Sequence, residues 1–292
     1  MRRAVLFAVA IMLAASATAD DSKPPSTGLS FFANTGAFWA GNATANFYSG
    51  KPANANTINR VLHSQTYGTE IWTILVQKHL ISPTAIGSYN QLQVVEYPDM
   101  YYRTSLQIGV GLRYDYPSGF GWLLRFDLDR LEAVGAFNLS SDGGTGILGT
   151  DQYVRCGMLG RENRVSAELA ITRTVPLSDN FCVEIDLGAS LVNTQVKDNI
   201  MEIGGGTWSI LDVWNGQSPA YGTQVFDYIN QGGFGYGVFI AFLAGWQVPG
   251  MGAIKAGYTC SQACTVLEGY TAWDWHHMLG VRIEMNNFSF FD

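Results

Sequence analysis

The chain has 292 residues, a formal charge of −7, 14% charged and 13% aromatic residues, and 33 glycines. This acidic balance argues against nucleic acid as a partner. No apolar run after the N-terminal region is as long as a membrane-spanning helix, so the composition argues against a helical membrane protein and suits strands that face lipid. A secreted soluble β-sandwich is the alternative for such strands.

The N-terminus has the organisation of a secretory signal. Arg2 and Arg3 precede an apolar run over residues 4–15, and Ala17-Thr18-Ala19 forms a small-residue cleavage site. We therefore expect a cleaved signal peptide over residues 1–19, with an uncleaved anchor as the alternative. Residues 20–27 are polar and proline-rich, and we expect a short flexible tail there.

A first strand is predicted over residues 29–39, followed by a long segment over residues 41–99. Ile58, Val61 and Leu62 are spaced for a helix that Asn56 or Thr57 would cap. A second helix over Ile71, Trp72, Leu75 and Val76 would be capped by Thr69. The sequence thus predicts a first outer loop with short helices that serves as a lid or partner surface, against the alternative of a plain surface excursion.

Residues 101–128 form the clearest hairpin of the chain. Apart from Thr104, even positions are aromatic or aliphatic from Tyr102 to Tyr116, whereas Arg103, Arg113 and Asp115 are among the odd positions. After the turn at Pro117 the alternation continues to residue 128. Alternating side chains point to opposite faces of a strand, so each strand has an apolar face and a charged face. This arrangement is typical of a transmembrane β-barrel with a polar interior.

The remaining strands are predicted over residues 164–175, 181–192, 234–247, 252–264 and 273–291, where the same alternation occurs. Residues 130–140 lose it, which suggests a bulge or an exit from the membrane, and residues 151–159 suggest a short strand above the bilayer. Residues 193–232 form a second outer loop. Turns near Pro117, Ser178 and Pro249 are short and the other connections are long. We therefore predict an all-β fold, an eight-stranded antiparallel transmembrane β-barrel over residues 28–292.

Charges of both signs are predicted to face the lumen of this barrel. At about eight strands a barrel interior is filled by side chains, and buried charges must pair. We therefore expect an ion-pair network that closes the lumen, with a narrow ion path as the alternative. The predicted set is Arg103, Arg113, Asp115, Arg125, Asp127, Asp129, Glu168, Glu184, Asp186, Lys255, Arg282 and Glu284.

Aromatic residues at the strand ends are predicted to lie at the membrane interfaces, where amphipathic rings are enriched. These residues are Tyr102, Tyr116, Trp122, Phe234, Trp246, Trp273 and Trp275.

One cluster has a catalytic appearance. Asp274 and His276 share the inward face of the last strand, with Glu268 nearby and Ser261 on the adjacent strand. A carboxylate-oriented histidine can activate a hydroxyl or a water. However, no serine motif accompanies the pair, and an interfacial aromatic belt with polar inner neighbours explains it as well. We expect no catalytic residues.

The four cysteines show neither a CxxC motif nor metal-ligand spacing. Unpaired thiols and one loop disulfide are both open, and we expect no metal and no cofactor. Cys156 falls in a predicted outer loop and Cys182 near a predicted inner turn.

The signal, the eight alternating strands and the terminal Phe288, Ser289, Phe290 and Phe291 together resemble small bacterial outer-membrane β-barrels of OmpA/OmpW-like architecture. Asp292 after the last phenylalanine departs from the usual terminal aromatic, and the Gly- and Asn-rich first loop is similar to outer-membrane proteins of Bacteroidota. The resemblance implies outer-membrane localisation and lipid contact.

We predict a non-enzymatic structural, adhesion or secretion-associated protein, with other outer-membrane or secretion proteins as partners of its loops. A small-solute or hydrophobic-molecule channel and a lipid-modifying hydrolase are the alternatives.

Overall fold

The computed structural model describes residues 27–81, 91–141, 153–211, 231–248 and 252–286. The predicted signal peptide, nearly all of the predicted tail and the terminal residues 287–292 lie outside these ranges. None of the helices in the described ranges is long and apolar enough to cross a membrane.

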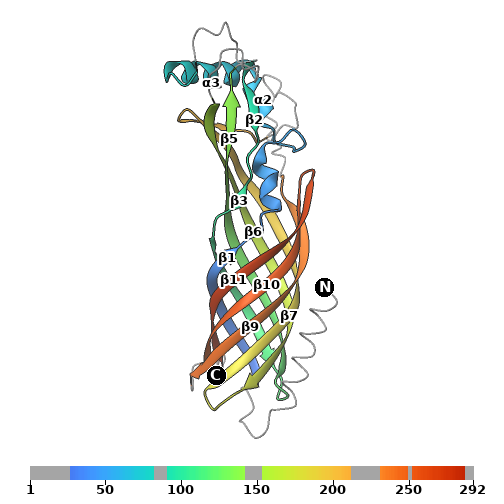
Figure 1. Ribbon diagram of the computed structural model, residues 1–292. Coiled ribbons are helices and arrows are strands. Elements are labelled where there is room, and N and C mark those ends of the chain that lie inside the picture. The colour runs from blue at the N-terminus through green and yellow to red at the C-terminus, as the bar shows by residue number, and fades with distance from the viewer. Residues whose placement is uncertain (1–26, 82–90, 142–152, 212–230, 249–251, 287–292) are drawn as a thin grey trace, which may run out of the picture.

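Eight antiparallel strands form a ring that is closed by hydrogen bonds, and they tilt strongly relative to the long axis of the molecule (Figure 1). Each strand pairs with its neighbours in the sequence, and the first pairs with the last, Phe32 opposite Glu284. The all-β prediction is confirmed. The ring strands are β1 (Gly28–Trp39), β4 (Ser105–Asp115), β5 (Phe120–Ser140), β6 (Tyr153–Pro176), β7 (Phe181–Ile203), β9 (Gly233–Val248), β10 (Gly252–Leu267) and β11 (Tyr270–Asn286).

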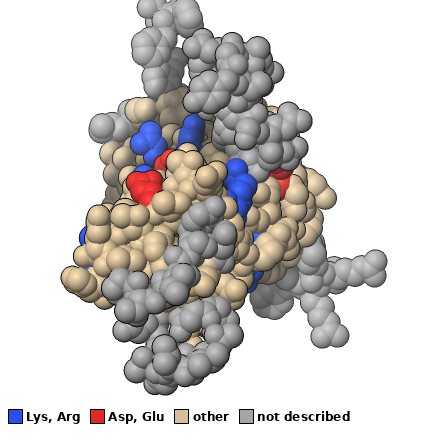
Figure 2. Space-filling view, turned by 90° about the horizontal axis from the view of Figure 1, so that it is seen from above, with Lys and Arg blue, Asp and Glu red and all other residues tan. Residues whose placement is uncertain are grey.

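Three of these strands continue beyond the ring and carry a second region, which we call the head. Its sheet consists of the outer parts of β5, β6 and β7, to which β2 (Gln93–Glu96), β3 (Tyr101–Tyr102) and β8 (Gly206–Ser209) are added. Its helices are η1 (Thr44–Ser49), α2 (Ile58–Leu62) and α3 (Gln65–Gln77), and α3 lies across the top in Figure 1. Seen from above, basic and acidic side chains are interspersed among neutral ones (Figure 2).

The head has an apolar core, which packs the helices against the inner faces of the long strands. Ile71 and Leu75 of α3, Phe47 of η1 and Phe137 of β5 are fully or almost fully buried in it. Burial of such side chains stabilises each by about 1.5–3 kcal/mol relative to exposure. The short helices therefore owe their stability to this packing more than to their own hydrogen bonds.

Several predicted boundaries were wrong, all of them where the ring meets the head. Residues 130–140 continue β5 beyond the ring, and residues 153–159 belong to the long strand β6 instead of forming a separate short strand. β7 runs to Ile203, well into the predicted loop 193–232. Alternation does persist in these parts, but the inward residues become apolar, for example Leu131 and Phe137. A search for strands with polar inward residues therefore does not detect these segments.

The first loop does contain helices, although one of the predicted caps was wrong. α2 begins directly after Thr57. The cap of α3 is Ser64, whose hydroxyl accepts the Tyr67 N–H at 3.4 Å. The helix therefore begins at Gln65, before Thr69. Thr69 lies inside the helix and donates its hydroxyl to the Gln65 carbonyl at 2.6 Å.

Candidate functional site

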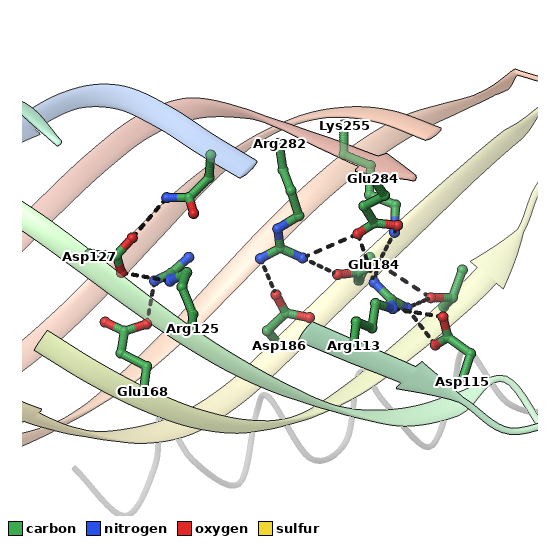
Figure 3. A network of polar contacts seen from close by, with 12 residues as sticks. Arg113, Asp115, Arg125, Asp127, Glu168, Glu184, Asp186, Lys255, Arg282 and Glu284 are labelled. Carbon is green, nitrogen blue, oxygen red and sulfur yellow. Dashed lines mark hydrogen bonds and ion pairs between the residues drawn. The ribbon is translucent and has the colours of Figure 1, made fainter. Parts of the chain in front are cut away.

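The interior of the ring holds a network of buried ionic side chains (Figure 3). The structure brings together eleven of the twelve predicted residues, each of them less than 8% exposed. All come from inward positions of the alternating strands, so the period of two decides their direction. They are Arg113, Asp115, Arg125, Asp127, Asp129, Glu168, Glu184, Asp186, Lys255, Arg282 and Glu284.

Glu184 of β7 is the centre of the part of the network that lies farther from the head. Its carboxylate accepts hydrogen bonds from Lys255 and Arg282, each at 2.6 Å, and forms an ion pair with Arg113. Glu284 adds a second carboxylate, 2.6 Å from the Lys255 ammonium. Three cations from three strands thus converge on two acidic side chains, which fixes the relative positions of those strands.

The two ends of this part are held by bidentate and charge-assisted contacts. Arg113 donates to both oxygens of Asp115, each at 2.8 Å, and to the Thr174 hydroxyl at 2.6 Å. Arg282 donates to Asp186 at 2.8 Å. Buried charges are costly unless they are paired, so this dense pairing permits an ionic interior.

A second ionic group lies nearer the head. Arg125 forms ion pairs with Glu168 and, at 2.8 Å, with Asp127, and the Asn34 amide donates to Asp127 at 2.9 Å. Asp129 follows on the same face and accepts from the Gln107 amide at 3.0 Å instead of from a cation.

A small apolar cluster packs against both ionic groups. It consists of Phe32, Leu123, Ala170 and Phe239, all at most 3% exposed. The Arg282 guanidinium lies 4.9 Å from the ring centroid of Phe32, within the range of a cation–π contact. Gly111 makes room for that ring, because a Cβ there would lie 2.3 Å from it.

Little free space is left beside these side chains. One cavity of about 20 Å³ lies beside Arg125 and Arg282, and another of about 40 Å³ lies beside Asp129 and His276. A single water requires roughly 10–15 Å³ of such volume. These cavities have room for no more than a few waters, and neither amounts to a continuous channel.

The mouth of the ring is covered by η1. The Tyr48 hydroxyl donates to Glu162 at 2.5 Å, and Arg164 donates to the other oxygen of Glu162 at 2.6 Å. The Tyr48 ring lies directly on Gly160, where a Cβ would be 2.2 Å from it. Burial, strengthened by the Glu162 carboxylate, raises the pKa of Tyr48 well above its ordinary value, so the hydroxyl remains a donor.

The pair with catalytic appearance holds the chain that leads into η1. The Asp274 carboxylate accepts the Ala43 N–H at 2.6 Å, and the Nδ1 atom of His276 accepts the Gly41 N–H at 3.1 Å. Ser261 lies opposite His276 in the sheet, but within the described ranges the two make no hydrogen bond. The acceptor positions that a catalytic pair would use are therefore occupied by backbone.

Two predicted positions are corrected by the structure. Arg103 lies outside the ring, with 63% of its side chain exposed and an ion pair to Glu132 at 2.5 Å. Tyr102 points inward and is 8% exposed, where Arg164 stacks 5.4 Å from its ring centroid. From the Tyr102–Ala133 pair to the Gln107–Asp129 pair, the segment from β3 to β4 advances by five residues, whereas β5 advances by four. This bulge of one extra residue exchanges the inward and outward positions, so that Tyr102 points inward and Arg103 outward.

The other six predicted aromatic residues lie on the outer face of the ring, Trp122 partly and the rest largely exposed. Near the head, Tyr236 and Trp273 pack edge to face at 5.4 Å. At the opposite end, Tyr114 stacks on Trp122 at 6.3 Å. Between the two ends, apolar side chains that include Leu106, Leu169, Leu191 and Leu279 are 58–65% exposed.

Glu162, Arg164 and Tyr48 are site residues that the sequence prediction missed. The predicted strand begins at residue 164, so Glu162 lies outside it, and the twelve predicted lumen residues do not include Arg164. The sequence signal that could have revealed this boundary is the change from polar Glu162 to apolar Met158 on one face of the strand.

The four cysteines are free, and Cys156 is in a strand of the head instead of an outer loop. In the described part of the chain, no three His, Cys, Asp or Glu side chains are grouped so that they could hold a metal ion.

Comparisons with known proteins are sparse. No protein-family model matches the sequence, and no curated protein matches it. Six chains of solved structures match the fold, among them Neisserial surface protein A. That match covers 89% of this chain and 98% of the other, with 7% sequence identity and a TM-score of 0.44.

Proposed function

We propose that the protein is a non-enzymatic outer-membrane protein whose strand ring crosses the membrane as a transmembrane β-barrel with a sealed lumen. In this proposal the head faces outward and acts as a structural, adhesion or secretion-associated surface. The observation that carries the proposal is the reversed polarity of the ring: its interior is ionic, whereas its exterior exposes a continuous set of large apolar side chains.

Membrane insertion explains this polarity. Exposed apolar patches on soluble proteins rarely exceed a few hundred Å², yet such residues occur on every ring strand, including Ile108, Ile171, Val238 and Ile283. Ring closure satisfies the backbone hydrogen bonds that lipid would leave unpaired. The aromatic residues at both ends match the two interfaces of a bilayer.

The sealed lumen is supported by the dense ion pairing and by the covering segment η1. Charged side chains from β4, β7, β10 and β11 meet in the centre of the ring. The backbone before η1 is held at the mouth by Asp274 and His276. Solute passage would require several of these contacts to break at the same time.

Insertion is tested by placing one charge at two exposed leucines. Leu169 lies in the apolar band of β6 and is 61% exposed, whereas Leu177 lies in the turn after β6 and is 60% exposed. In a bilayer, Leu169→Arg should destabilise by about 2–4 kcal/mol, and Leu177→Arg by about 0–1 kcal/mol. The measurements are urea unfolding in lipid vesicles and the heat-dependent shift in gel migration. Equal, small effects of both substitutions would indicate a soluble protein.

Conductance in planar bilayers tests the sealed lumen. We expect no steady current from the wild type. A steady current that changes on Arg113→Gln or Asp127→Asn would contradict a sealed lumen and support a channel.

Turnover of lipid A and phospholipid tests the non-enzymatic assignment. We expect no product from the wild type. Product that disappears in His276→Ala, in a variant that still inserts, would show that the protein is a lipid-modifying hydrolase.

A further inference from the structure

The outer face of β5 changes character along its length as it leaves the ring. Phe126 and Leu128 belong to the apolar band, and Arg130 and Glu132 follow on the same face. Ala136 then lies in the floor of a groove on the head. Leu128 and Ala136 are about 25 Å apart along the strand, at roughly 3.3 Å per residue. A lipid beside this strand would therefore meet an apolar, then a charged, then a concave surface.

The charged level is a girdle that crosses neighbouring strands. Glu132 pairs with Arg103 at 2.5 Å and with Arg161 at 3.5 Å, and Arg161 reaches Asp198 of β7 at 3.4 Å. Arg130 is exposed beside them and forms no ion pair within the described ranges. The cations of the girdle thus outnumber its carboxylates, in a chain whose net charge is −7.

The groove directly above the girdle has a volume of about 590 Å³. Tyr97 and Tyr101 line it with apolar ring surface. Asn138 contributes an amide, and Glu96 and Asp99 contribute carboxylates. Arg155 lies opposite Asn138 in the β5–β6 pairing, is exposed, and has no ion-pair partner in the described part of the chain. Aromatic surface combined with carboxylate and amide groups suits the hydroxyl-bearing ring of a sugar, and the Arg155 guanidinium suits one anionic group attached to it.

We infer that the girdle and the groove bind the phosphorylated sugar headgroup of a glycolipid in the outer leaflet, an inference that rests on the proposed membrane insertion. Arg130 and its neighbours in the girdle take a phosphate by charge-assisted hydrogen bonds. The sugar lies in the groove against Tyr101, and Arg155 takes a second anionic group.

The position of the girdle favours a lipid over a free sugar. On β5 the apolar band reaches the girdle directly, because Phe126 and Leu128 precede Arg130 on the outer face. On β6 and β7 the polar Asn163, Asn193 and Gln195 lie between the girdle and apolar residues such as Val165 and Leu191. Acyl chains along Phe126 and Leu128 would bring a headgroup to the level of Arg130. A free sugar has no acyl chains and would make no contact with the apolar band.

Binding is measured with the full-length protein in mixed micelles, with a bisphosphorylated disaccharide glycolipid of the lipid A type as probe. Arg130→Gln combined with Arg155→Gln removes two cations that make no ion pair within the described ranges, so folding should be preserved. We expect affinity to fall about a hundredfold, tenfold for each lost charged hydrogen bond. Lys78→Gln removes an exposed cation at the end of α3 that does not line the groove, and should change nothing.

Tyr101→Ala separates sugar recognition from simple anion binding. Its ring is 53% exposed, and its loss should weaken the glycolipid while leaving phosphatidylglycerol binding unchanged. Equal weakening of both lipids by the arginine variants, or equal affinity for a phosphorylated disaccharide without acyl chains, would overturn the inference. The inference would also be overturned if the double arginine variant and Tyr101→Ala both bound the glycolipid with wild-type affinity. The Leu169 and Leu177 comparison establishes insertion separately, so failure of the lipid site is distinguishable from failure of the membrane assignment.

Discussion

The ring and the head are built from the same strands but have opposite polarity. In the ring, β5 directs Arg125, Asp127 and Asp129 inward, and a few residues later the same face directs Leu131 and Phe137 into the head. β6 changes in the same way. The geometry of the strand is unchanged, since side chains still alternate. Only the surroundings differ, and they decide which face is polar.

One sheet thus serves two environments. Where the outside of the sheet is apolar, charged side chains are placed inside and must neutralise one another. Where the outside carries the girdle and other polar residues, the inside is an ordinary apolar core. Tyr48, Glu162 and Arg164 lie at the boundary, and their hydrogen bonds close the polar interior against the apolar core.

The largest expected effect comes from the centre of the ionic interior. Glu184→Leu leaves Arg113, Lys255 and Arg282 without their shared carboxylate, and breaking a buried pair in this way costs about 3–5 kcal/mol. The unfolding midpoint in urea measures this loss. Glu132→Gln removes an exposed carboxylate with two ion pairs and should cost at most about 1 kcal/mol. Similar losses for both would mean that the interior is hydrated.

The head should unfold independently of the ring. Ile71→Ala removes a fully buried side chain between α3 and the sheet, which costs about 2–5 kcal/mol of local stability. Protease should then cut the head while the ring keeps its heat-dependent gel shift. Ile171→Ala, at a position of the ring exterior that is 63% exposed, serves as the control and should leave the cleavage pattern unchanged. Simultaneous loss of both regions would show a single cooperative unit.

A smaller effect is expected at the boundary. Gly160→Ala places a Cβ 2.2 Å from Tyr48, so η1 must shift, at a cost of about 1–3 kcal/mol. Gly157→Ala on the same strand meets its nearest atom at 3.5 Å and should be tolerated. Protease sensitivity of residues 41–50 measures the shift. Equal protease sensitivity of the two variants would show that the Tyr48 ring does not lie on Gly160.

The smallest effect concerns a thiol of the head core. Burial raises the pKa of Cys156 to about 12, so the folded protein keeps the thiol protonated at pH 8. Maleimide should modify Cys156 only after unfolding, as peptide mapping can show. Because the pKa is raised in the folded state, this group lowers stability only as pH rises from about 9, its unfolded value, towards 12. Rapid labelling at pH 8 would contradict a buried thiol.

The sequence was sufficient for most of the ring because one rule, the period of two, applies to each strand separately. That rule selected Arg113, Asp127 and Glu184 as inward residues before any pairing was known. It failed at Arg103 and Tyr102, where a single extra residue reverses the faces. It also failed beyond Asp129, because the inward residues there are no longer polar.

The alternation can be read from the sequence alone, and with it the strands of the ring, their polar and apolar faces and the helical content of the first loop. These are local properties, set by neighbouring residues along the chain. Only the tertiary structure decided that Glu184 unites three cations, that η1 covers the mouth and that Asp274 and His276 bind backbone. Such contacts join residues up to 235 positions apart, and they depend on ring closure and register, which no local pattern contains.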